Sequence, residues 1–376
     1  MDFKFSEDQL AISELAESLF GDFGNDAAMA AHDTSGEAMR FDIWDKVIET
    51  GLHALLIPED QGGSGLGMQD LLAVLIPQGK HLGQVPLWRH QLVALAVSHF
   101  LGDDKTALVE RLAAGEVLAT LSLDAHYESQ VNQLSLKIQE GQPPLLSGRV
   151  TAVPLGDTAQ SAILTVVVAG KPHLVLVENL NDAGIKKVNG RSQFYEGVSN
   201  LEFSNVAVSL FPQEAFAWLE QRSIACLAAL QLGVLTGQVG RAVSYTAERQ
   251  QFERAIGSFQ AVQMTMADCF IDCEVLRTSL YQLVWRLDQG YDCTPQAYAT
   301  KYLANSAGHR VGHLAQHVHG GIGVDRTYPI HRFLYWSRAL SIALGGTGAH
   351  LERLGDWLAD NNNLGWKYDL DEHQKV

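Results

Sequence analysis

The spacing of apolar residues changes twice along the chain and predicts three regions. Up to residue 119, and again from residue 213 to the end, apolar residues recur at the intervals typical of amphipathic helices. Between residues 120 and 212 they form short β-branched runs bounded by Gly, Pro, Asn and Asp, which is typical of strands. We therefore expect an α+β multi-domain protein, with N-terminal helices over 1–119, a small β-barrel or sandwich over 120–212, and a helical bundle over 213–376.

The first region begins with a helix-start signal. Ser6 and Gln9 have the spacing of a capping box, and Phe5 and Leu10 can form a hydrophobic staple. Two further helices are expected, over residues 40–56 and 68–82. The stretch "GGSGLG" between them lacks the spacing of a dinucleotide fingerprint, and no strand precedes it, so we expect a helix–helix connection there.

The second and third regions have different element lengths. Strands are expected in "SAILTVVVAG", "HLVLVENL" and "NLEFSNVAVSLF", with "QPPLLSGRV" supplying the turn between two strands. The third region has four long helical segments, over 213–250, 258–289, 294–318 and 329–361, which is the pattern of a four-helix bundle. The last segment contains "SIALGGTGAH", and since glycine costs about 1 kcal/mol relative to alanine inside a helix, we expect the helix to break there.

Composition and charge narrow the class of protein. The net charge of −16 and the pI near 5.2 argue against nucleic acid as the main partner, because phosphate binding needs a basic surface. The N-terminus lacks the features of a signal peptide, and no apolar window approaches the roughly 18 residues needed to span a bilayer. Four cysteines in a chain of this size fit a reducing compartment, so we expect a cytoplasmic protein without a membrane span.

Cys269 and Cys273 lie one helical turn apart beside Asp268 and Asp272, a pattern that raises the question of a metal site. A zinc site would need further thiols or imidazoles at suitable spacing nearby. We instead expect two small, half-buried residues on an amphipathic helix, and we predict no metal.

Four stretches of the chain resemble the acyl-CoA dehydrogenases and their flavoprotein relatives. They are "GLHALLIPEDQGGSGLGMQDL", "LSGRVTAVPLGDTAQSAIL", "YTAERQQFERAIGSFQAVQMTMAD" and "HVHGGIGVDRTYPIHRFLYWSRAL". The third is the most specific, because an Arg, a Phe, a Gly and a Gln recur there in fixed order. The short length, "GQVPL" and the "LGGTGAH" turn are similar to subunits of bacterial heteromeric acyl-CoA dehydrogenases that shorten steroid side chains.

The resemblance implies a homo- or heterotetramer whose subunits have an α-domain, a β-domain and a C-terminal four-helix bundle, with FAD between the last two. It implies removal of two hydrogens from an acyl-CoA thioester. A carboxylate takes the α-proton, and the β-hydrogen leaves as hydride to the flavin. An electron-transferring flavoprotein then reoxidises the flavin.

The resemblance assigns Arg249 to the pyrophosphate of a neighbouring subunit's FAD, and a guanidinium fork suits paired phosphate oxygens. Phe252 and Gln260 follow at the family's spacing, and Phe252 would pack against the cofactor or within a core. The alternative for Arg249 is a solvated arginine beside Glu248 and Glu253. Glu253 stands where the family usually has Gly, and it adds a negative charge near the expected phosphates.

In "HVHGGIG", Gly320 and Gly321 resemble the glycines that let the backbone approach a neighbour's FAD. His317 stands where Gln is usual, and an imidazole can still donate one hydrogen bond. The alternative for His313, His317 and His319 is a helix end at which histidines favour the C-terminal dipole.

Two positions in the β-domain match segments that contact the flavin in the family. Ser122 lies in "ATLSLDAHYE", where a Thr-Glu-Pro-like run is common, and Thr151 lies in "GRVTAVP", which matches the second segment. The aromatic residue that commonly covers the flavin is not there. The subunit therefore either holds FAD differently or has an impaired flavin pocket of its own.

Neither position that supplies the family's catalytic base holds a carboxylate. One precedes Gly-Thr in the turn after "RAL", where Gly345 stands, although Thr347 of that turn can still touch cofactor. The other lies ten residues before Gly233, which gives Ser223. Glu220, three residues earlier on roughly the same helix face, could reach the substrate, but it also fits an exposed first-turn glutamate favoured by the dipole.

We favour a subunit that lacks its own base and completes the FAD site of a homologous partner in an α2β2 tetramer. One alternative is an autonomous, homo-oligomeric acyl-CoA dehydrogenase with Glu220 as a relocated base. The others are a related flavin oxidase or monooxygenase, and a flavin-free structural subunit.

Overall fold

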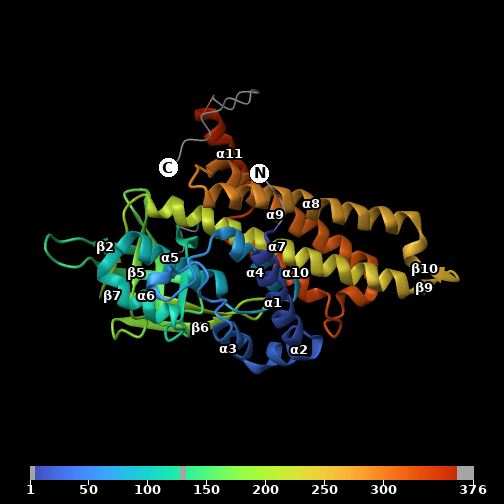
Figure 1. The fold of residues 1–376 in the computed structure, drawn as a ribbon, viewed down its shortest axis with the longest axis horizontal. Helices are drawn as coiled ribbons and strands as arrows, with labels where there is room; N and C mark the ends of the chain where they lie inside the picture. Colours follow the sequence, from blue (N-terminus) through green and yellow to red (C-terminus); the bar gives the residue numbers. More distant parts are fainter. Residues whose placement is uncertain (1–4, 128–132, 362–376) are drawn as a thin grey trace. The chain divides into compact units, whose positions relative to one another are not determined.

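The computed structural model describes residues 5–127 and 133–361, and its elements follow the order helices, strands, helices (Figure 1). The α+β fold class is confirmed, because helices precede and follow the strands among the described residues. The chain forms two compact units: Met1–Met29, Met68–Gly83 and Ile224–Val376 in one, Ala30–Gly67 and Gln84–Ser223 in the other. The division into three domains at residues 119 and 212 stays a prediction.

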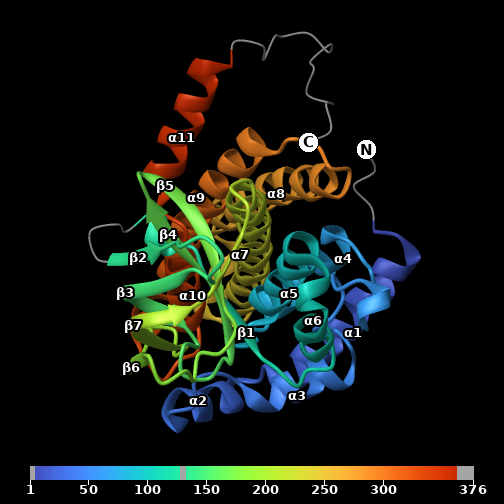
Figure 2. The same ribbon diagram turned by 90° about the vertical axis from the view of Figure 1, so that its left-hand side faces the viewer.

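The second of these units contains two four-stranded sheets among its described residues (Figure 2). The first sheet has the order β1 (Ala119–Ser122), β4 (Ser161–Val168), β5 (Lys171–Val177), β8 (Ser209–Leu210). The second has the order β2 (Gln133–Lys137), β3 (Leu145–Pro154), β7 (Gly197–Ala207), β6 (Ile185–Arg191). Three α-helices lie wholly in this unit, α3 (Phe41–Glu49), α5 (Leu87–Leu101) and α6 (Thr106–Ala113), together with 3-10 turns η1 (Glu59–Gln61), η2 (Gly102–Lys105) and η3 (Asp124–His126).

Two element predictions in this unit are wrong in part. The helix expected over 40–56 ends at Glu49, and Gly51 adopts a φ of 74°, which a helix cannot continue. The stretch "LLSGRV" is strand rather than turn, because it begins β3, which pairs with both β2 and β7. The three predicted strand runs coincide with β4, β5 and β7–β8.

A buried histidine fixes the start of β1. The Nδ1 atom of His90 accepts the Ala119 N–H at 3.3 Å, and its Nε2–H donates to the Leu112 carbonyl at 3.1 Å. Burial lowers the pKa of His90 from 6.5 to about 3, so the imidazole is neutral and holds one tautomer. This bond anchors the strand that ends at Ser122.

The other unit begins with α1 (Glu7–Phe23), and its capping box is confirmed. Ser6 Oγ accepts the Gln9 N–H at 3.2 Å, and the Gln9 side chain accepts the Ser6 N–H at 3.1 Å. Helix α1 packs against α4 (Met68–Lys80), and a short α2 (Asp26–Ser35) follows it. Phe5 lies edge-on to the Tyr281 ring, with centroids 5.6 Å apart.

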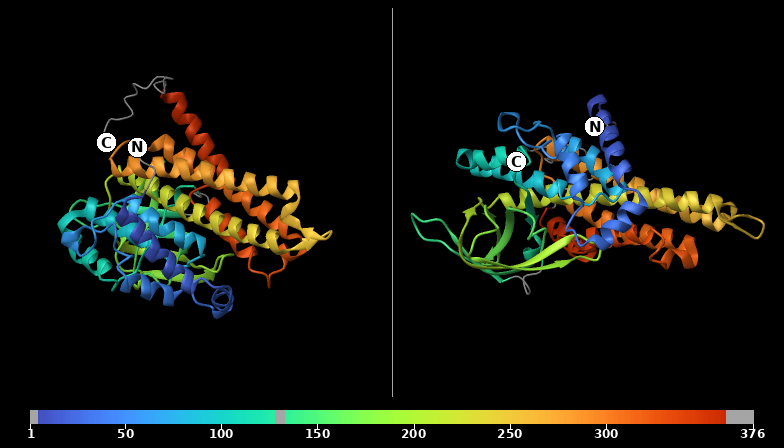
Figure 3. Two further views of the ribbon diagram at one scale, coloured as in Figure 1. Left: turned by 45° about the vertical axis from the view of Figure 1, so that its right-hand side comes forward. Right: turned by 90° about the horizontal axis from the view of Figure 1, so that it is seen from below.

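The long helices of the bundle are α7 (Ala215–Glu248), α8 (Gln260–Asp288), α9 (Thr294–His319), α10 (His331–Ile342) and α11 (Thr347–Asp360). Helix α9 packs against α8, α10 and α11, and it runs beside α8 along most of its length (Figure 3). Small residues bring α7 close to its neighbours, since a Cβ on Gly308 would lie 2.9 Å from the Gln231 side chain. The predicted helix break is confirmed, because α10 ends at Ile342 and α11 begins at Thr347.

Helix α7 corrects one statement of the sequence analysis. By length and composition, an 18-residue window of α7 is apolar enough to cross a membrane, although no such window was expected. Of that window, 83% is buried inside the fold, as in the core helix of a globular protein. Its apolar composition is therefore explained by core packing, and no membrane span is indicated among the described residues.

Candidate functional site

A short hairpin projects from the end of the helical bundle, between α7 and α8 (Figure 1). Its strands are β9 (Gln250–Gln251) and β10 (Arg254–Ala255), which pair antiparallel. The turn residues Phe252 and Glu253 both have positive φ, 53° and 65°, as a two-residue hairpin turn requires. The Phe252 side chain is 85% exposed, so the turn presents a phenyl ring to solvent.

Arg249 joins α7 to this hairpin. Its N–H donates to the Tyr245 carbonyl at 2.9 Å, and its own carbonyl accepts the Ile256 N–H at 2.8 Å. The backbone is therefore held at both ends while the side chain is exposed. The guanidinium forms no ion pair with Glu248, Glu253 or any other described residue, and it remains available to an external anion.

Aromatic packing joins the ends of α7 and α9. The Tyr245 and His319 rings stack with centroids 4.4 Å apart, and Tyr328 packs on His319 at 5.4 Å. Because Tyr245 lies one turn before Arg249, this stack brings Arg249 and the glycines after α9 to the same end of the bundle. The sequence analysis did not identify Tyr245 and Tyr328 as residues of this site. The spacing of four residues between Tyr245 and Arg249, which corresponds to one helical turn, could have indicated Tyr245.

The dipole interpretation is wrong for His319. The ring is buried, its Nδ1–H donates to the Ala315 carbonyl at 2.6 Å, and burial lowers the pKa of the imidazole. A neutral imidazole gains little from the negative end of a helix. His319 instead acts as a packing surface for the two tyrosines.

The remaining predicted cofactor residues of the bundle are exposed. His317 lies in the last turn of α9, and Gln260 is the first residue of α8. Gly320 has a φ of 62°, and a Cβ built on Gly320 or Gly321 meets no atom within 4 Å. Open backbone, an exposed phenyl ring and an unpaired guanidinium fit the phosphate and adenosine end of a dinucleotide.

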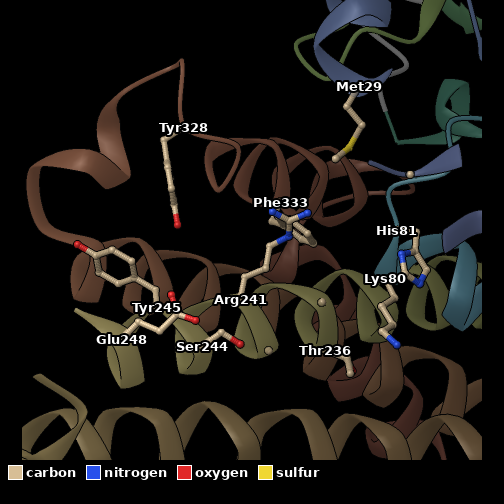
Figure 4. A pocket seen from close by; sticks show the side chains of 13 residues that line it. Met29, Lys80, His81, Thr236, Arg241, Ser244, Tyr245, Glu248, Tyr328 and Phe333 are labelled. Carbon is tan, nitrogen blue, oxygen red and sulfur yellow. The ribbon is translucent and has the colours of Figure 1, made fainter. Parts of the chain in front are cut away.

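A pocket of about 450 Å³ lies beside this end of the bundle (Figure 4). One wall of the pocket is the face of α7 from Thr236 to Glu248. Tyr245 and Tyr328 lie at the end of the pocket nearest the C-terminus of α7, which Arg249 follows in the chain. Arg241 is bound by both carboxylate oxygens of Asp26, at 2.8 and 3.0 Å. On the opposite side, Lys80 and His81 both contact the Glu17 carboxylate. Arg241, Lys80 and His81 are thus each paired with a carboxylate. The pocket therefore has little net positive charge with which to select an anion.

The glycine-rich turn is held by two buried side chains. Lys301 Nζ donates to the Leu340 carbonyl and His350 Nε2–H to the Leu344 carbonyl, each at 2.6 Å. Burial lowers the pKa of His350 to about 4, so this donor is neutral. These bonds hold two carbonyls of the backbone that leads into Gly345, whose φ is 85°.

The backbone of the same turn uses one of its donors internally. The Gly345 N–H donates to the Ile342 carbonyl at 3.1 Å, so it is not directed at a ligand. Thr347 is half-buried at the first position of α11. The turn is therefore ordered without a carboxylate at the position where the resemblance expects a base.

The predicted flavin contacts of the β-unit lie on strands of two different sheets. Ser122 is buried at the end of β1, and Thr151 is half-buried on β3. The two strands are joined where Thr120 Oγ1 donates to the Pro154 carbonyl at 2.7 Å. Their assignment to a flavin stays a prediction.

Glu220 is buried, and its carboxylate accepts a hydrogen bond from the Tyr127 hydroxyl. The interpretation as an exposed first-turn glutamate is wrong, since the side chain is 3% exposed and α7 begins five residues earlier, at Ala215. Strand β1 ends at Ser122, η3 comes next, and Tyr127 follows η3. The hydrogen bond from Tyr127 therefore connects Glu220 to the segment that begins with Ser122. Ser223 is also buried, and its hydroxyl donates to the Leu219 carbonyl at 2.8 Å.

The cysteine pair on α8 has no ligand-like features. Cys269 and Cys273 are buried, and burial raises the pKa of these thiols to about 11 and about 12. Asp268 and Asp272 both bind Arg310, at 3.2 Å. Protonated thiols and paired carboxylates are poor metal ligands, and no group of three or more metal-ligating side chains occurs among the described residues.

Known proteins share this architecture. Residues 221–359 match the family model described as "Acyl-CoA dehydrogenase, C-terminal domain". Acyl-CoA dehydrogenase FadE27 of Mycobacterium tuberculosis is 31% identical over 347 residues, covering 85% of this chain and 89% of FadE27. A solved structure of a Tcur3481-Tcur3483 steroid ACAD variant matches with a TM-score of 0.88 and 31% identity, covering 95% of this chain and 99% of that one. A chain of the ChsE4-ChsE5 complex from M. tuberculosis matches with a TM-score of 0.89 and 29% identity, covering 96% and 99%.

Proposed function

The chain belongs to the acyl-CoA dehydrogenase family of oxidoreductases, and from this premise we propose that it completes the FAD site of a homologous partner subunit. The assembly would be an α2β2 tetramer that introduces an α,β double bond into an acyl-CoA thioester. An electron-transferring flavoprotein would accept the electrons. The buried, unbridged cysteines fit the cytoplasmic location that we propose.

The hairpin after α7 is the observation that carries this proposal. Phe252 is 85% exposed, and Arg249 beside it has no ion-pair partner among the described residues. An exposed phenyl ring and an unpaired guanidinium contribute little to the stability of their own chain. Both side chains are instead placed to contact a ligand that lies outside this chain. The flavin of a neighbouring subunit would be such a ligand.

Six residues at the end of the bundle would hold that flavin. Arg249 would bind the pyrophosphate, and the neighbours that would contact the rest are Phe252, Gln260, His317, Gly320 and Gly321. When bound, FAD would supply the hydride acceptor, and the protein would position the cofactor and polarise the reacting groups. Glu253 opposes the phosphates electrostatically, so Arg249 must offset its charge as well.

The base would come from the partner. A general base must lie within hydrogen-bond reach of the proton it removes, and neither Gly345 nor Ser223 can accept that proton. The partner's carboxylate would then remove the α-proton, while the ordered turn at Gly345 contributes only backbone. The ChsE4-ChsE5 complex shows that a similar chain occurs with a second protein.

The same comparisons support a substrate class. One similar structure is that of a steroid ACAD variant, which shares 31% identity with this chain and covers 95% of it. We propose a CoA thioester with a bulky, steroid-like acyl group as the substrate of the assembly.

Flavin stoichiometry tests the proposal. The chain is co-expressed with a homologous dehydrogenase encoded beside it, and FAD per tetramer is measured by absorbance. Arg249→Ala should lower bound FAD about 10-fold or more at limiting flavin, because a charge-assisted phosphate contact is lost. Arg111→Ala, an exposed arginine on α6, is the matched control and should leave FAD unchanged. Full occupancy in Arg249→Ala would contradict the proposal, and a colourless wild-type assembly would indicate a flavin-free structural subunit.

A second candidate function rests on Glu220. Its burial and its contact with Tyr127 give it a defined position near the segment of Ser122, as an autonomous dehydrogenase with a relocated base would require. This candidate predicts a yellow, active protein when the chain is expressed alone.

A further inference from the structure

Two histidines lie on the exposed face of helix α9. His309 and His313 are four residues apart, a spacing that places them one turn apart on the same side of the helix. Both side chains are exposed, whereas Val311, Gly312 and Ala315 beside them in the sequence are buried. The packing of α9 in the bundle therefore does not account for the two imidazoles.

The rings of His309 and His313 lie at the separation that a shared metal ion requires. Their centroids are 4.6 Å apart, and their planes are inclined by 65°. When two imidazoles bind one metal, each bonding nitrogen lies about 2.0–2.1 Å from the ion, so each ring centroid lies about 3.2 Å from it. With an angle of about 90–110° between the two bonds, the centroids are then about 4.5–5.2 Å apart. The observed separation falls within this interval, and rotation of the exposed rings can direct one nitrogen of each at the ion.

The ligand type limits which metals can bind. Imidazole nitrogen suits copper, nickel and zinc, whereas magnesium and calcium require oxygen ligands. A structural zinc site uses four protein ligands, and no group of three or more metal-ligating side chains occurs within residues 5–127 and 133–361. Two histidines leave the other positions of the ion to water, so the ion would be exchangeable.

Two arginines near the histidines decide how charge affects the site. Arg310 binds Asp268 and Asp272, each at 3.2 Å, so its charge is offset. Arg338 lies close enough to His313 to oppose a positive charge there. Because both histidines are exposed, solvent and salt screen this repulsion. It disfavours cations that bind through charge alone and leaves those that form strong bonds to nitrogen.

We propose that His309 and His313 form a two-histidine chelate for a divalent transition-metal ion, which binds Cu²⁺ more tightly than Ni²⁺ or Zn²⁺. The site is separate from the proposed function, since neither histidine is among the six residues that would hold the flavin. The expectation of no metal rested on Cys269 and Cys273 of α8, and His309 was not considered with them.

Copper titration of the untagged full chain tests the chelate. Isothermal titration calorimetry should show saturable binding of Cu²⁺, and electron paramagnetic resonance of the bound ion should show two nitrogen ligands. His309→Ala and His313→Ala should each lose this binding as completely as the double variant, because a chelate needs both ligands. Alanine favours the helix at both positions, so the variants should fold, which circular dichroism verifies. His173→Ala on β5 is the matched control and should bind Cu²⁺ like the wild type.

Two results would overturn the chelate. The first is wild-type affinity for Cu²⁺ in His309→Ala or His313→Ala. The second is a partial loss shared by every variant, His173→Ala included, which would indicate adventitious binding to scattered histidines. An excess of Mg²⁺ should not displace the copper, and displacement would contradict ligation by imidazole. Flavin binding by Arg249→Ala is measured without added metal, so the proposed function stands or fails independently of these results.

Discussion

Glu220→Gln separates a structural from a catalytic carboxylate. The substitution keeps the shape of a side chain that is 3% exposed and replaces an acidic acceptor of the Tyr127 hydroxyl by an amide. If a partner supplies the base, the assembled enzyme should exchange the α-proton of its substrate at the wild-type rate. The cost should appear in stability instead.

The size of that cost follows from the contact. A hydrogen bond to a charged acceptor contributes about 1.5–3 kcal/mol, and one between neutral groups about 0.5–1.5 kcal/mol. Glu220→Gln should therefore lower the free energy of unfolding by about 1–2 kcal/mol. Tyr127→Phe removes the same bond from the other side, so the double variant should cost less than the sum of the two single variants.

Two assays decide between the roles. Urea unfolding gives the stability of each variant, and deuterium exchange at the α-carbon of a CoA thioester gives the proton transfer. A loss of exchange of about 10²–10⁴-fold in Glu220→Gln, with bound FAD intact, is what a general base would produce. That result would refute the partner-base account and support the autonomous enzyme.

Two further predictions concern a buried histidine and the glycine turn. Since the pKa of His90 is about 3, the unfolded chain binds a proton that the folded chain does not between about pH 6.5 and 3. As the pH is lowered through that range, the free energy of unfolding should fall by up to about 1.4 kcal/mol per pH unit. Urea titrations at about pH 7.5 and 5.5 should show a smaller fall for His90→Gln than for the wild type. Equal falls in the two proteins would contradict this. In the turn, Gly345→Ala should lower the free energy of unfolding by about 1–2 kcal/mol because the φ of Gly345 is 85°. Gly346→Ala should lower it less, because the φ of Gly346 is −76°. Equal shifts in the thermal unfolding midpoint of the two variants would count against the assigned turn.

Local signals in the sequence predicted much of the architecture. The capping box at Ser6, the strand runs and the helix break before Thr347 depend on neighbouring residues, and the structure has all three. Where a local pattern competes with packing, the prediction is less complete. The run after Gln142 reads as a turn by its prolines, yet pairing with β2 and β7 makes most of it strand.

The site depends more on distant contacts. The burial of Glu220 comes with a contact to Tyr127, 93 residues away, so no spacing near Glu220 indicates it. The stack of Tyr245 on His319 likewise joins the ends of two helices that no short motif links. The sequence analysis therefore proposes which residues contact a cofactor, but only the fold shows that Arg249 and Gly320 lie at one end of the bundle.

The central claim is that this chain completes the flavin site of a homologous partner. Native mass spectrometry of the chain co-expressed with its neighbouring dehydrogenase reports partner, stoichiometry and flavin count together. The account predicts an α2β2 assembly that contains FAD and loses it in Arg249→Ala. A flavin-loaded homotetramer of this chain alone, active on an acyl-CoA, would contradict it.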